Sequence, residues 1–159
     1  MGEFVTTVNA TSNSSANTAD TFIELSGVIL GVKRIRVRLG DGTATAGLDN
    51  DYIVSIARKT AGGATGTSGT ITKMNIMGAA SGATVNVKNG TGAFTTATQQ
   101  AVLDSAVING RAIFEWVARD EDDIIRNHFT TGSGGIIAVN IASSVVSQKF
   151  QVSVFWIEY

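Results

Sequence analysis

Apolar and polar residues alternate most clearly over positions 147–159. Phe150, Val152, Val154 and Trp156 recur at every second position, and polar residues separate them in the first half of the segment. Neighbouring side chains of a β-strand point to opposite faces, so a period of two predicts a strand with one buried face. The second face also becomes apolar towards the end of the segment, where we expect cover on both sides. Removal of this strand should unfold the domain.

Shorter runs of the same kind predict further strands along the chain. They lie at 22–25, 28–39, 52–58, 71–77, 84–88, 111–119 and 136–141. Gly, Asn and Asp, which favour turns, separate these runs. Residues 95–107 fit either a short helix or a strand. The pattern predicts an all-β fold, an antiparallel β-sandwich of the jelly-roll type, with an open immunoglobulin-like sandwich as the alternative.

The N-terminal segment is more polar than the rest of the chain. Residues 9–20 consist of Asn, Thr, Ser, Ala and Asp, and contain no apolar residue large enough to order them. We therefore expect residues 1–20 to form a flexible arm and residues 21–159 to form a single β-sandwich domain. A chain of 159 residues is long enough to bury a core of its own.

The charge of the chain is low and balanced. Charged residues make up 16% of the sequence and the formal net charge is -1, so the basic excess of a nucleic-acid-binding protein is missing. The sequence has no cysteine, which excludes disulfides and thiolate metal sites. No stretch approaches the roughly 18 apolar residues that predict a membrane span. We expect neither nucleic acid nor a membrane among the partners.

Three arginines form the sharpest local pattern. Arg34, Arg36 and Arg38 alternate with apolar residues, which places three guanidinium groups in a row on one face of a strand. One interpretation is a basic strip that binds an acidic protein surface or a phosphate. The other is a solvated sheet face on which neighbouring strands supply Asp or Glu opposite each arginine. We take the three residues as candidate partner contacts.

Asp120, Glu121, Asp122 and Asp123 form the densest acidic cluster. Adjacent side chains on an extended segment point away from one another, so a metal site here would need ligands from elsewhere in the chain. A solvated turn, or an acidic contact for Lys and Arg of a partner, needs nothing more. The four residues are our second set of candidate partner contacts, and no metal site is predicted.

Catalytic chemistry finds little support in the sequence. His128 is the single histidine, and neither a companion motif nor a nucleotide-binding loop accompanies it. A pair of carboxylates could still converge in the folded chain, as in glycosidases. We expect a non-enzymatic protein with no cofactor and no catalytic residues.

The order of several segments resembles that of a phage protein family. The segments are Val32–Val37, Ile53–Lys59, Phe114–Trp116, Ile137–Asn140 and Val152–Glu158. Over residues 22–159 the chain resembles the jelly-roll head decoration, or capsid cement, proteins of tailed bacteriophages. Where this family often has Asp-Phe-Gly in a late strand, the chain has Phe114, Glu115 and Trp116, and the Pro and Arg that usually follow are missing.

The resemblance implies a structural protein of the virion. It implies a homotrimer on the outer surface of the head, which binds the major capsid protein and stabilises the capsid lattice without chemistry. The alternative is a receptor- or carbohydrate-binding tip of a tail fibre, for which Tyr52, Trp116 and Trp156 are the few aromatic candidates. A jelly-roll shell subunit is a third possibility, which the small size and the lack of a basic arm disfavour.

Overall fold

The computed structural model describes most of the chain. It covers residues 2–12, 18–40, 50–59, 66–75, 77–89, 99–127, 135–145 and 147–159, without the side chains at 99 and 100. Regular structure in these residues is β-strand throughout. The strands are β1 (Gly2–Thr11), β2 (Asp20–Ser26), β3 (Leu30–Leu39), β4 (Asp51–Lys59), β5 (Thr67–Ser68), β6 (Thr72–Lys73), β7 (Thr84–Val87), β8 (Gln99–Asn109), β9 (Phe114–Val117), β10 (Ile125–Arg126), β11 (Ile136–Ser143) and β12 (Lys149–Glu158). A search of this part of the chain for a helix of membrane-spanning length and hydrophobicity finds none.

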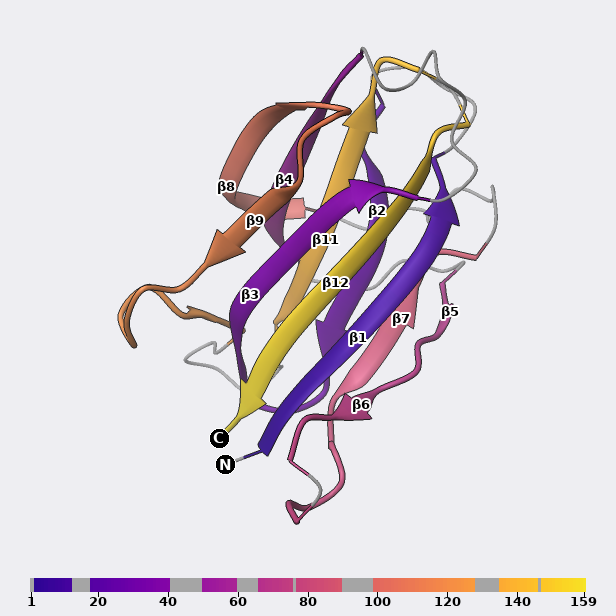
Figure 1. Cartoon of the computed structure of the whole chain (residues 1–159). Coiled ribbons are helices and arrows are strands. Elements are labelled where there is room, and N and C mark those ends of the chain that lie inside the picture. Colours follow the sequence, from indigo (N-terminus) through magenta and orange to yellow (C-terminus); the bar gives the residue numbers. More distant parts are fainter. Residues whose placement is uncertain are drawn as a thin grey trace.

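Two antiparallel sheets pack face to face and form a β-sandwich, as predicted (Figure 1). One sheet, here called the β12 sheet, has the order β10-β3-β12-β1-β6, with β9 also paired to β3. The other, the β11 sheet, has the order β5-β7-β2-β11-β4-β8. Strand pairing is nested along the chain: β1 pairs with β12, β2 with β11, β3 with β9 and β10, and β4 with β8.

The predicted C-terminal strand lies at the centre of the β12 sheet. Phe150, Val152, Val154 and Trp156 of β12 are buried, which confirms the alternation read from the sequence. The ring of Phe150 meets aromatic rings of the opposite sheet edge to face, at centroid distances of 5.6 and 5.1 Å. Aromatic side chains bury large areas in such arrangements, so β12 organises the core between the sheets.

The prediction of a flexible arm over residues 1–20 is wrong for residues 2–11. This segment is strand β1, which pairs with β12 over its full length, from Gly2 opposite Glu158 to Thr11 opposite Lys149. Its inward side chains have a period of two and are buried: Phe4, Thr6, Val8 and Ala10. Thr6 and Ala10 are polar or small, so the alternation of buried residues was not visible in the sequence. Pairing with β12 orders the strand. Residues 13–17 lie outside the described part of the chain.

Other element predictions need correction as well. The ambiguous segment at 95–107 is strand β8 from residue 99 onwards, and residues 95–98 lie outside the description. The predicted strands at 71–77 and 111–119 shorten to β6 and β9. Lys88, expected on the outside, is buried because its Nζ lies 2.7 Å from Asp20 Oδ2 and over the ring of Phe22.

Candidate interaction surface

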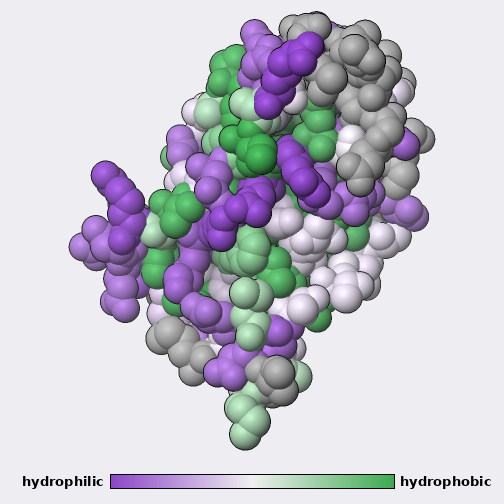
Figure 2. Space-filling model, in the orientation of Figure 1, coloured by the Kyte–Doolittle hydropathy of each residue, from purple (hydrophilic) through white to green (hydrophobic). Residues whose placement is uncertain are grey.

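The outer face of the β12 sheet carries the arginine row. In β3, Ile35 and Val37 are fully buried, so Arg34, Arg36 and Arg38 alternate to the opposite, outward face, as predicted. Figure 2 shows this side of the molecule, where hydrophilic residues cover most of the surface and hydrophobic residues lie between them. The surface is therefore mixed in character.

An acidic residue on the neighbouring strand is shared by two of the arginines. Glu115 of β9 lies opposite Arg36, and its Oε1 accepts hydrogen bonds from Arg34 Nε at 2.7 Å and from Arg36 Nη2 at 3.0 Å. These hydrogen bonds, first from Arg34 and then from Arg36, lower the pKa of Glu115. Arg38 instead donates from Nε to Gln151 Oε1 at 2.6 Å. A solvated sheet face, with an acidic residue across from each arginine, was one of the two interpretations of this row. Glu115 is such a residue for Arg34 and Arg36. Contact of the three arginines with a partner stays a prediction.

The acidic cluster forms the turn that follows β9. Asp120 Oδ1 accepts hydrogen bonds from the backbone amides of Asp122 and Asp123, at 3.0 and 3.2 Å. Asp123 Oδ2 accepts a hydrogen bond from Arg119 Nε at 2.8 Å, which lowers the pKa of the carboxyl group and raises that of Arg119. Glu121 and Asp122 are exposed. Two of the four carboxylates therefore shape the turn, and two face solvent, where their contact with a partner stays a prediction.

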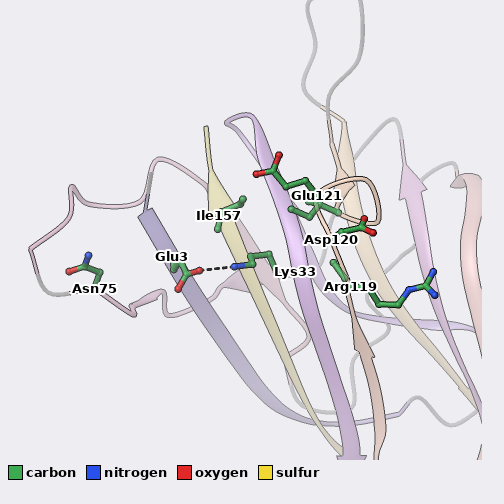
Figure 3. Close-up of a pocket in the computed structure, with 9 residues that line it drawn as sticks. Glu3, Lys33, Asn75, Arg119, Asp120, Glu121 and Ile157 are labelled. Atoms are coloured by element: carbon green, nitrogen blue, oxygen red, sulfur yellow. Dashed lines mark hydrogen bonds and ion pairs between the residues drawn. The ribbon is translucent and has the colours of Figure 1, made fainter.

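A surface hollow of about 610 Å³ links the turn to the sheet. In Figure 3 the ion pair of Glu3 on β1 and Lys33 on β3 crosses Ile157 of β12, with a Nζ–Oε1 distance of 2.8 Å. Asp120 and Glu121 line the same hollow. The structure thus brings the acidic turn next to the beginning of the arginine row, while the row itself runs on along β3, away from the turn.

A smaller, more apolar hollow of about 210 Å³ adjoins the first and shares Glu3, Lys33 and Ala118 with it. Its apolar lining includes Phe155 and Val117. The guanidinium carbon of Arg34 lies 5.4 Å from the centroid of the Phe155 ring, within the range of a cation–π contact. This end of the sheet therefore combines a small apolar centre with a charged rim.

Several of these residues were missed at the sequence level. Glu3 lay in the segment predicted to be a flexible arm. Phe155 was predicted only to lie on a face of the C-terminal strand that is covered. Glu115 was visible as the one charged residue in an apolar run, but nothing in the sequence showed that β9 would lie beside β3. Pairing between distant strands is what converts these scattered residues into one surface.

The described residues hold no group of three or more His, Asp or Glu side chains arranged to bind a metal ion. His128 lies outside the described residues. Among the described residues, three carboxylates line the larger hollow: Glu3 is in an ion pair with Lys33, Asp120 accepts hydrogen bonds from backbone amides of the turn, and Glu121 is exposed.

Comparison with known proteins gives no match among family models, curated proteins or solved structures. The strand pairing and the surfaces described above are therefore the basis for a functional inference.

Proposed function

We propose that the chain is a non-enzymatic structural protein of a tailed-phage virion, a decoration or cement protein on the outer surface of the head. The observation that carries this proposal is the nested pairing of strands, which corresponds to one long hairpin folded across two sheets. This supports a jelly-roll topology, the fold expected of the decoration proteins that the sequence resembles. Because one fold serves many functions, the choice among them depends on the surfaces of the molecule.

The outer face of the β12 sheet is the proposed contact with the major capsid protein. An apolar centre at Phe155 lies beside charged groups on β1, β3 and the turn after β9. Protein–protein contacts commonly have this arrangement of an apolar core and a polar rim. Arg38 and the exposed carboxylates of Glu121 and Asp122 are the rim groups that a partner would reach.

The proposed mechanism is binding alone. A homotrimer seated on the head engages several capsid subunits at once, and the repeated contacts hold neighbouring subunits together through multivalency. No covalent step or cofactor is required. The free energy of association would then appear as resistance of the filled head to heat and to the pressure of the packaged DNA.

Immunogold electron microscopy tests the location. Antibody against the recombinant chain is applied to virions that carry its gene, with virions from which the gene has been deleted as the control. Label spread evenly over intact heads is the expected result, together with earlier DNA release on heating of the deleted virions. Label confined to the tail would overturn the proposal.

A tail-only label would instead favour the receptor- or carbohydrate-binding tip. The three aromatic candidates named from the sequence give that alternative little support, because Tyr52 and Trp156 are buried in the core and Trp116 is half-buried. Sugar recognition commonly uses exposed aromatic rings, which these three side chains do not provide.

A further inference from the structure

Among the strands that the structure describes, β8 is an edge of the sandwich. It is the outermost strand of the β11 sheet in this set and pairs there with β4 alone (Figure 1). Over its eleven residues, Gln99–Asn109, the only charged residue is Asp104. Long edge strands usually carry several charges, a proline or a cover that prevents contact with other chains. β8 has only one such charge.

An apolar strip runs along this edge on the outward face of the β11 sheet. Tyr52 and Val54 point into the core, so Ile53 between them points outward, and it pairs with Val107 of β8. Further along, Val102 pairs with Ala57. The exposed fractions are 47% for Ile53, 69% for Val107 and 50% for Val102. Ser55 and Ser105 pair with each other between these positions, so the strip is apolar at both ends, has two small polar side chains in the middle and holds no charged side chain.

The backbone of the edge is only partly available for pairing. Gly110 donates its amide to Asn50 O at 2.9 Å, and the alternation of an antiparallel ladder then turns the amides of Val107 and Ser105 away from β4. The amide of Ser105 is already bonded to Asp104 Oδ1 at 2.8 Å. A strand added at this edge would have to displace the Asp104 carboxylate.

We propose that the strip formed by Ile53, Val102 and Val107 is the surface through which a second copy of this chain binds, by side-chain packing and not by extension of the sheet. Contacts between identical subunits are more apolar than other protein contacts and are depleted in charge, which matches this strip. The charged outer face of the β12 sheet fits a different partner. The inference rests on the homotrimer of the proposed function and names its contact surface.

The first test is the oligomeric state of the recombinant chain by sedimentation velocity over a range of concentrations. The wild type is expected to sediment above the monomer mass. V107K and V102K should each weaken association about tenfold or more, because a lysine must be desolvated within the contact. M77K is the matched control, since Met77 is 93% exposed and lies outside the strip, and it should associate as the wild type does. Circular dichroism establishes that each variant is folded.

Asp104 supplies a test in the opposite direction. D104A removes the acceptor of the Ser105 amide, so this amide can pair with an added strand and larger, open-ended assemblies are expected. D104N keeps a side-chain oxygen that can accept from Ser105 and should keep the wild-type assembly.

A wild type that stays monomeric, or lysine variants that associate normally, would overturn the inference. Either result would leave the head location untouched, because that is decided by the immunogold label. A third outcome is label on the tail together with a wild-type oligomer that V107K dissociates. It would overturn the proposed function and leave the inference about the contact surface intact.

Discussion

At the scale of single residues, Glu158 near the end of β12 ties the two sheets together. Its carboxylate accepts hydrogen bonds from the hydroxyl of Ser81, the amides of Gly82 and Ala83, and Trp156 Nε1. Burial acts to raise the pKa of Glu158, but these hydrogen bonds together outweigh burial and lower it below the ordinary value of 4.5. The segment that leads into β7 of one sheet is thereby fastened to the last strand of the other.

E158Q should destabilise the fold at neutral pH by about 1–3 kcal/mol, the usual cost of weakening hydrogen bonds to a charged group. Because the folded-state pKa lies below 4.5, the stabilisation by the carboxylate is present above that pH and is lost as the pH falls towards the folded-state value. Urea unfolding at a series of pH values should therefore show a smaller acid-induced loss in E158Q than in the wild type. E121Q, at an exposed carboxylate, is the control, and equal pH profiles for E158Q and the wild type would contradict the prediction.

At the scale of elements, a buried ion pair links β4 and β2 across β11. Lys59 Nζ lies 3.0 Å from Glu24 Oε1 and 2.6 Å from Thr21 Oγ1, and both charged side chains are almost fully buried. Thr21 in turn donates to Asn140 Oδ1 of β11 at 2.8 Å. Three strands of the β11 sheet therefore share one polar network.

K59M should cost about 3 kcal/mol or more, because it removes the Lys59 ammonium group from beside the buried Glu24 carboxylate. The double variant K59M/E24M should recover much of that loss, since apolar replacements of similar volume often substitute for a buried pair. Urea denaturation of the two single variants and the double variant gives the coupling energy. Additive losses would show that the two side chains stabilise the fold independently.

The sequence predicted β3, β4, β11 and β12 well because their apolar residues alternate or form continuous runs. It missed β1, where Thr6 and Ala10 occupy inward positions and interrupt the apolar period. Burial of Lys59 and Lys88 was equally hidden, because Glu24 and Asp20 reach them from another strand. Of the candidate site, the direction of the arginine row followed from local periodicity, while the position of Glu115 depended on the pairing of β9 with β3.

F4A tests the order of β1 directly. Phe4 is buried and stacks on Trp156 at a centroid distance of 5.8 Å, so its removal should cost about 3–5 kcal/mol in the free energy of unfolding. The control N9A changes an exposed residue of the same strand and should be nearly neutral. A flexible arm would instead make both substitutions neutral in chemical denaturation.

At the scale of the whole molecule, two surfaces of different chemistry lie on different sheets. The outer face of the β12 sheet carries Arg38 and the acidic turn, whereas the strip along β4 and β8 is uncharged and mainly apolar. In our proposals the first surface contacts the capsid and the second contacts another copy of the chain. Contacts of such different character respond differently to salt.

Raising the salt concentration should weaken binding to heads and leave self-association nearly unchanged. Salt screens exposed charges over distances of about 8–10 Å, but it has little effect on apolar contacts. Co-sedimentation with heads that lack the protein measures binding to the head. Sedimentation velocity of the free protein measures self-association. Dissociation of the oligomer by salt, with unchanged head binding, would reverse the assignment of the two surfaces.

The stacking of Trp156 on Phe4 also gives the molecule an internal optical probe. The indole of Trp156 contacts β1 through its ring and Glu158 through Nε1, so its environment depends on two separate attachments. The chain has one other tryptophan, Trp116, and W116F would leave Trp156 as the sole indole emitter. Its fluorescence spectrum would then report changes in the packing of β1 and in the hydrogen bond to the Glu158 carboxylate.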